Sequence, residues 1–149
     1  MPKQSTVQRV RRMQKKGKSS SAQAGEFVRK VIDDVREKKH GVRNTKQAIA
    51  IGLSEARRAG VKLPAPKKRT ASAATRTKAA QDMARGKKPV KAVSAKRSKA
   101  TTRALKREGH TAVSRRALSA QTKKAAGKRT AAQRSASAKK AARTRKAAK

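Results

Sequence analysis

Apolar residues recur at helical spacing near the N-terminal end of the chain. Between residues 21 and 39 they follow one another at steps of three and four, which places them on one face of a helix, while charged residues fill the opposite face. Ser20 and Gln23 have the spacing of a capping box, and Gly41 can end the helix in the left-handed conformation. We therefore predict a helix over residues 21–39. Its apolar stripe consists of Ala24, Phe27, Val28, Val31, Ile32 and Val35.

A second periodic segment follows a short link. Asn44 or Thr45 can serve as its N-cap, Gln47 has capping-box spacing from Asn44, and Gly60 marks its stop. The pattern predicts a helix over residues 45–59. Its apolar face consists of Ala48, Ile49, Gly52, Leu53 and Ala56.

Ile51 lies off this apolar face and would be exposed in a simple hairpin. Together with Gly52, which allows close backbone approach, it indicates a second packing surface, such as a homodimer contact through the head. Packing of Ile51 against the N-terminal arm, or against Val61 and Leu63, accounts for it equally well. Both interpretations stay open.

The flanking segments differ from this hairpin. Residues 1–20 form a basic arm, although the absence of acids and the helical spacing of Val7, Val10 and Met13 are also typical of an organelle transit peptide. Prolines 64 and 66 disfavour helix at the exit of the head, residues 21–63. We predict an all-α protein, in which a small helical hairpin head is followed by a long basic tail, residues 64–149, largely disordered but with helix propensity.

Charge sharpens the contrast between head and tail. The chain of 149 residues has 45 Lys and Arg against 7 Asp and Glu, a net charge of +38. The tail holds 28 of these cations but only two acids, Asp82 and Glu108. Such a segment has too little apolar surface for a core of its own and is expected to bind a polyanion.

Adjacent basic pairs are spread along the tail, and each can neutralise phosphates with release of counterions. If about 15 tail cations contacted a duplex, the slope of log K against log salt would be about −13. The single aromatic residue, Phe27, lies on the predicted apolar stripe, so stacking on bases is not expected. The candidate nucleic-acid-binding residues are Lys67, Lys68, Arg69, Lys87, Lys88, Lys96, Arg97, Lys106, Arg107, Arg115, Arg116, Lys123, Lys124, Lys128, Arg129, Lys139, Lys140, Arg145 and Lys146.

Patterns for other chemistry are missing. His40 and His110 have no carboxylate and nucleophile at triad-like positions, the glycines are scattered singly, and there is no cysteine. We expect no enzyme activity, no cofactor, no metal site and no small-molecule substrate. The acids Asp33, Asp34 and Glu37 are interpreted as surface ion pairs rather than metal ligands.

Two further binding modes are disfavoured. The predicted hairpin could be a DNA-reading helix-turn-helix with Lys46, Gln47, Ala50 and Ser54 facing bases, but its link is long and no third helix braces it. A membrane role is not expected, because the tail lacks the bulky apolar side chains that insert at an interface, and no apolar run approaches the ~20 residues of a membrane span.

The head resembles a known family in two runs, residues 24–29 (Ala-Gly-Glu-Phe-Val-Arg) and residues 43–60, whose centre reads Lys-Gln-Ala-Ile-Ala-Ile-Gly-Leu-Ser-Glu-Ala. Residues 1–66 are similar to small basic bacterial proteins of domain-of-unknown-function family 6496. Members often carry the name plasmid stabilisation protein, and the resemblance implies no catalytic or binding residues. The tail resembles the Lys- and Ala-rich linker-histone-like proteins of bacteria in composition.

These observations favour a non-enzymatic, sequence-independent DNA-binding protein, histone-like and associated with the nucleoid in the bacterial cytoplasm. Duplex DNA is the expected partner, and a homodimer through the head would tether two tails. Two alternatives remain. One is a plasmid stabilisation protein whose head binds a protein partner, and the other is an RNA- or ribosome-associated basic protein.

Overall fold

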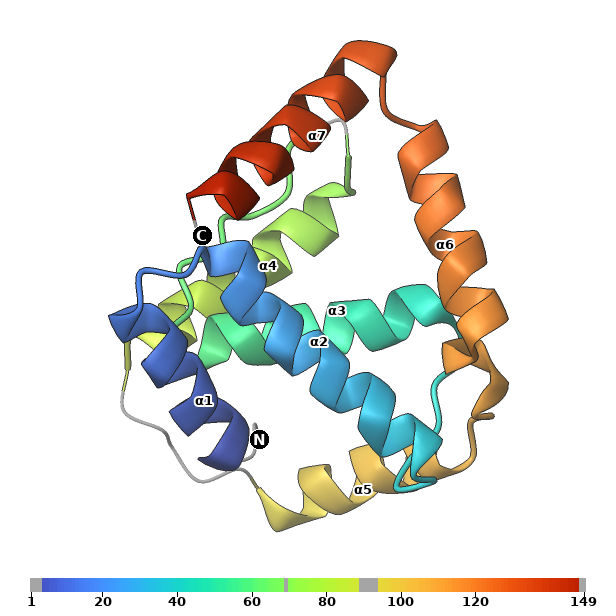
Figure 1. Ribbon diagram of the computed structural model, residues 1–149. Coiled ribbons are helices and arrows are strands. Elements are labelled where there is room, and N and C mark those ends of the chain that lie inside the picture. Colours follow the sequence, from blue (N-terminus) through green and yellow to red (C-terminus); the bar gives the residue numbers. More distant parts are fainter. Residues whose placement is uncertain (1–3, 69, 89–93, 148–149) are drawn as a thin grey trace. The chain divides into compact units, whose positions relative to one another are not determined.

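The structure, a computed structural model, describes residues 4–68, 70–88 and 94–147. It is all-helical over these residues, with no strand among them, so the predicted all-α class is confirmed (Figure 1). The chain divides into two compact units, unit 1 (Met1–Val113) and unit 2 (Ser114–Lys149). The helices are α1 (Gln4–Lys15), α2 (Ser20–Arg36), α3 (Thr45–Arg58), α4 (Ala73–Gly86), α5 (Ala95–Lys106), the 3-10 helix η1 (Thr111–Val113), α6 (Arg115–Gly127) and α7 (Ala131–Lys146).

Helix α2 is the first predicted helix, with both ends shifted from the prediction. Its N-cap is Ser19, whose Oγ accepts from the amide of Ala22 at 3.3 Å, whereas Ser20 was expected. It ends at Arg36 because Lys38, at φ 57°, takes the left-handed position expected of Gly41. The amides of Lys38 and Lys39 then bond the carbonyls of Val35 and Asp34, which is a Schellman motif.

Helix α3 matches its predicted bounds to within one residue. Asn44 caps it by accepting from the amide of Gln47 at 2.9 Å, as predicted. Gly60, at φ 88°, ends it in the left-handed conformation, also as predicted. The pattern of the head therefore carried enough information to locate the hairpin.

Gly52 is the point where α3 meets α2. A Cβ at this position would lie 2.6 Å from the Cα of Val28, so only glycine permits the observed approach. Figure 1 shows α2 crossing α3, with α1 alongside α2. The close approach expected of Gly52 thus occurs within the hairpin.

Two apolar clusters form the core of unit 1. The first joins α1 to the hairpin, because Val10 of α1 packs with Phe27 and Val61, so the predicted basic arm is a docked helix. In the second, Ile51 packs against a cluster that includes Val113 of η1. The buried members are Val10, Ala24, Phe27, Ala56 and Val61 in the first cluster, and Val31, Val35, Val42, Ala48 and Val113 in the second.

The tail differs from the expectation of a largely disordered segment, because its described residues contain α4 to α7 and η1. Helix α4 packs on α3, where Ala79 and Asp82 are buried, and Val113 fills the second cluster. Gly86 approaches α3 so closely that a Cβ would lie 2.2 Å from the carbonyl oxygen of Arg57. Composition averaged over residues 64–149 hides these contacts, because a few residues make them.

Candidate nucleic-acid interface

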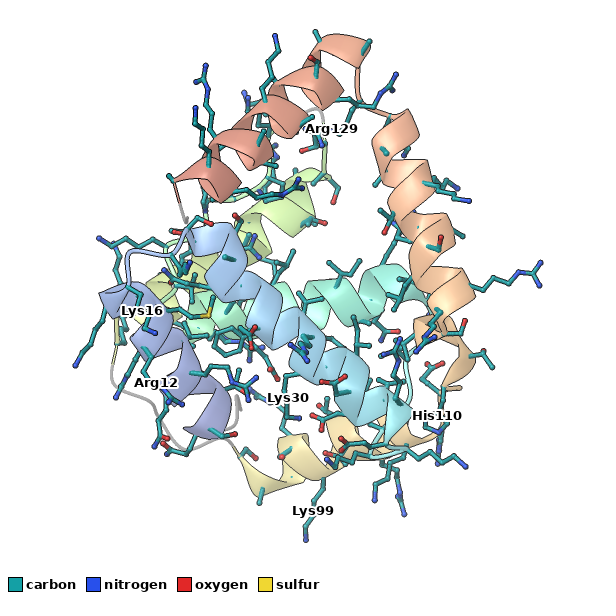
Figure 2. The ribbon with its side chains drawn as sticks, viewed as in Figure 1. Arg12, Lys16, Lys30, Lys99, His110 and Arg129 are labelled. Atoms are coloured by element: carbon teal, nitrogen blue, oxygen red, sulfur yellow. The ribbon has the colours of Figure 1, made fainter. Side chains whose placement is uncertain are left out.

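The predicted basic pairs of the tail lie at the surface. Every one of these residues is exposed except Arg69, which lies outside the described residues. They come from the segment before α4, from the end of α4, from both ends of α5, and from α6, α7 and the link between these two helices. Arg129 lies between α6 and α7, and its guanidinium donates to the carbonyl of Gln133 at 3.1 Å (Figure 2).

Unit 2 is built from two helices that need no core. Ser114 caps α6 by accepting from the amide of Ala117 at 3.2 Å, and Thr130 caps α7 in a capping box with Gln133. Neither helix has a buried residue, and Ala, Ser, Lys and Arg surround α7 on all sides. The helices are therefore held by local hydrogen bonds and alanine propensity rather than by packing.

The acids are confined to unit 1, and unit 2 contains none. Six of the seven acids lie within ion-pair distance of a Lys or Arg in unit 1. The pairs are Arg9–Glu26 at 3.0 Å, Arg29–Asp33 at 4.0 Å, Lys30–Asp34, Lys39–Glu37, Arg43–Glu108 at 3.4 Å and Arg58–Asp82 at 3.6 Å. Unit 1 thus neutralises part of its own charge, and unit 2 has no means to do so.

Asp82 fixes α4 to α3. Its carboxylate is buried and accepts a 2.6 Å hydrogen bond from the hydroxyl of Ser54. Nε of Arg58 lies 3.6 Å from the other carboxylate oxygen, beyond hydrogen-bond distance, so this contact is ionic. Arg58 also donates to Oγ of Ser54 at 3.0 Å, which closes a three-residue network.

Glu108 marks the second place where the tail meets the head. Next to it, the amides of Gly41 and Val42 donate to the carbonyls of Leu105 and Gly109, both at 2.9 Å. A Cβ at Gly41 would lie 1.8 Å from the carbonyl oxygen of Glu108, so Gly41 serves this contact rather than the end of α2. Thr45 and Arg36 complete the seam by donating to the carbonyls of Ala112, at 2.6 Å, and Val113, at 3.2 Å.

Shifted pKa values occur at Glu55, Glu37 and Lys39 among the residues that the structure describes. Burial raises the pKa of Glu55. Lys39 holds the pKa of Glu37 below its ordinary value through a hydrogen bond, and the same contact raises the pKa of Lys39. None of these groups belongs to a constellation with catalytic geometry in the described residues.

The helix-turn-helix interpretation fails on the placement of α3. Lys46 and Ala50 are exposed. The side chain of Gln47, however, accepts a hydrogen bond from the amide of Arg43. Ser54 donates to Asp82, a buried residue of α4. Half of the supposed reading surface is therefore already used inside unit 1. No group of three metal-ligating side chains occurs among the residues that the structure describes, and Asp33, Asp34 and Glu37 engage Arg29, Lys30 and Lys39.

The search for adjacent basic pairs missed single cations on the same helices. These are Lys78, Arg85, Lys99, Arg103, Arg134 and Arg143, all exposed. It also left out the exposed cations of α1, because residues 1–20 were not counted with the tail. A tally of every cation, independent of pairing, would have found both groups.

Comparison with known proteins bears on the N-terminal part of the chain only. No curated protein and no solved structure matches the chain. Within the described ranges, none of the helices has the length and apolarity to cross a membrane. Residues 2–69 match the model of a family whose description is "Family of unknown function". The resemblance predicted for residues 1–66 is thereby confirmed: residues 2–69 of this chain are similar to the family of unknown function DUF6496.

Proposed function

We propose that this chain is a non-enzymatic, sequence-independent DNA-binding protein of the histone-like kind, associated with the bacterial nucleoid. The observation that carries the proposal is unit 2, which has 13 Lys and Arg and no acid. Its described basic side chains are all exposed, and its helices bury nothing. A surface with this charge and no neutralising partner binds polyanions through counterion release.

Duplex phosphates fit unit 2 better than base edges do. Reading of bases requires a few side chains held in a fixed geometry, whereas the cations of α6 and α7 are exposed on helices that no buried residue holds in place. If about ten of them contact phosphates, the slope of log K against log salt is about −9. Binding is then steeply salt-dependent and indifferent to sequence.

The helices of unit 2 are coupled to this binding. Helix α6 has 13 residues and α7 has 16, close to the ~12–15 residues below which isolated helices are marginal in water, and the like charges Lys139 and Arg143 at i, i+4 weaken α7 further. In this proposal both helices are only partly populated in the free protein. Phosphates that neutralise the cations remove this repulsion and favour the helical state.

A salt titration of binding tests the proposal. Fluorescence anisotropy compares the full chain with a variant that ends at Val113, on two unrelated duplexes and one structured RNA. Removal of residues 114–149 leaves both apolar clusters of unit 1 complete. We expect the full chain to bind both duplexes equally, and the shortened chain to lose most of the affinity and salt dependence.

Two results would overturn the proposal. A strong preference for one duplex would assign sequence reading to the chain. A clear preference for the structured RNA would place the protein among RNA-associated basic proteins. The helical signal in circular dichroism, recorded with and without duplex, checks the coupling of folding and binding separately.

A further inference from the structure

The C-terminal end of α1 and the residue that follows it carry a basic face, called the α1 basic face and defined as Arg11, Arg12, Lys15 and Lys16. All four side chains are exposed, and no ion pair joins them to any residue that the structure describes. Arg12 and Lys16 extend from α1 in Figure 2. No acid occurs anywhere in residues 1–25, so the helix cannot neutralise this face itself.

The α1 basic face belongs to a folded surface. Thr6 and Val10 on the opposite side of α1 are buried, and Val10 packs in the first apolar cluster with Phe27. Arg9 reaches Glu26 of α2 at 3.0 Å, which fixes the edge of the helix. The cations of α1 are therefore presented in a fixed array, in contrast to those of unit 2.

Stability of α1 does not explain this array. Arg11–Lys15 and Arg12–Lys16 are like-charge pairs at i, i+4, which destabilise a helix. Cations in the last turn of a helix are stabilised by the helix dipole, but one or two cations are enough for that stabilisation. An array of repelling charges on a docked helix fits a surface that is neutralised by a ligand.

The charge density of the face matches a duplex. The five residue steps from Arg11 to Lys16 cover about 7.5 Å of helix axis. A duplex carries one phosphate per about 1.7 Å of its axis, so a segment of equal length carries about four phosphates. The four cations of the α1 basic face balance that charge one to one.

We propose that the α1 basic face is a second duplex-binding surface, so that a single chain bridges two DNA segments, one on unit 1 and one on unit 2. The proposal rests on the proposed function, because unit 2 supplies the first binding event. A duplex held by unit 2 raises the effective concentration of unit 1 near any neighbouring segment. Bridging then needs no homodimer.

A co-capture experiment tests the proposal with the full chain. One duplex is fixed to beads, an unrelated labelled duplex is free, and protein-dependent recovery of the label reports bridging. The test variant carries Arg11→Gln, Arg12→Gln, Lys15→Gln and Lys16→Gln; glutamine preserves helix propensity at these exposed positions. We expect recovery to fall about tenfold or more, and the salt slope of binding to become shallower by about 3.6.

The matched control removes the same charge from α5 through Lys96→Gln, Arg97→Gln, Lys99→Gln and Arg103→Gln. Helix α5 has no buried residue, so it offers no fixed array, and recovery should fall clearly less than in the α1 variant, by the general loss of four charges alone. A second variant, Arg11→Lys and Arg12→Lys, keeps the charge of α1 and should bridge normally. Unchanged thermal unfolding of all three variants shows that unit 1 is intact.

The outcomes separate the two proposals. If the original chain binds no duplex, the proposed function is wrong. If it binds and bridges, but the α1 variant bridges equally well or the α5 variant loses as much, the second surface is not on α1.

Discussion

Unit 1 and unit 2 are both dominated by Lys and Arg, yet they use these residues in opposite ways. Unit 1 contains all seven acids and sets six of them against cations, while its apolar side chains close two clusters. Unit 2 contains no acid and buries no side chain in its helices. The buried and ion-paired residues of unit 1 therefore depend on their positions, whereas the helices of unit 2 bury no residue that fixes a position.

The largest effect is expected at Val113. Val113→Asp places a carboxylate among Val31, Val35, Val42 and Ala48 and should lower the free energy of unfolding by about 3–5 kcal/mol. Denaturant unfolding followed by circular dichroism measures it. Ala138→Asp, on the exposed surface of α7, is the matched control and should leave unit 1 unaltered. An equal loss of unfolding free energy in Val113→Asp and Ala138→Asp would contradict this difference between the units.

The next effect is expected at Asp82. Asp82→Ala leaves the hydroxyl of Ser54 and the charge of Arg58 without their partner and should cost about 2–3 kcal/mol. Limited proteolysis should then cut α4 faster than α1, because α4 loses its buried anchor. Glu37→Ala removes an exposed acid and should change neither readout; a loss there would mean that exposed pairs also hold unit 1 together.

Substitution of two glycines of unit 1 by alanine should change the stability of the unit in opposite directions. Gly41→Ala forces the chain away from the carbonyl of Glu108 and should destabilise unit 1 by about 1–2 kcal/mol. Gly25→Ala, in α2 with no atom within 4 Å of the new Cβ, should stabilise it by about 0.5–1 kcal/mol. Thermal unfolding of both variants measures these changes. Higher stability of Gly41→Ala would exclude the close contact between Gly41 and the carbonyl of Glu108.

A smaller effect is expected from the pH dependence of Glu55. Burial raises its pKa above the ordinary 4.5, so the native state binds the proton more tightly than the unfolded state. Its contribution is fully favourable below pH 4.5 and is lost as pH rises through the raised pKa. Glu55→Gln should thus be more stable than the original chain at neutral pH but not at pH 4. Glu37 has a lowered pKa, so any contribution from it is instead lost as pH falls, and because its ion pair with Lys39 is exposed we expect almost no pH-dependent difference for Glu37→Gln.

The smallest effect is expected in unit 2. A chain in which residues 115–146 are shuffled, with composition kept, should retain its affinity for duplex DNA within about threefold, because counterion release depends on the number of contacts. Anisotropy at two salt concentrations measures it. A loss of more than tenfold would show that unit 2 has a specific geometry.

The hairpin could be predicted from sequence because its residues repeat at helical spacing and its caps are local. Asn44 and Gly60 were placed correctly for this reason, and the end of α2 was missed by three residues because Lys38 took a conformation usually left to glycine. The docking of the tail could not be predicted from periodicity. It depends on single residues far apart in sequence, chiefly Asp82 and Val113.

A signal for this docking was nevertheless present. The two acids of the tail, Asp82 and Glu108, stand at the two places where it meets the head. In a segment of such uniform charge, a rare acid marks a specific contact. The candidate basic residues of the tail are exposed where the structure describes them, and their binding role stays a prediction. The basic face on α1 could be recognised only from the structure, because it depends on the burial of the opposite side of the helix.

The position of Val113 in the sequence also sets a delay between the synthesis of the hairpin and the synthesis of the residue that completes its second cluster. Ribosomes add about 5–20 residues per second, so roughly 3–11 s pass between the completion of Arg58 and that of Val113. During this interval α2 and α3 exist without the residue that closes their second cluster. Mutual repulsion between nascent chains of such high positive charge keeps them apart until closure. The cations that we propose to bind DNA in the finished protein thus also protect it while it is being made.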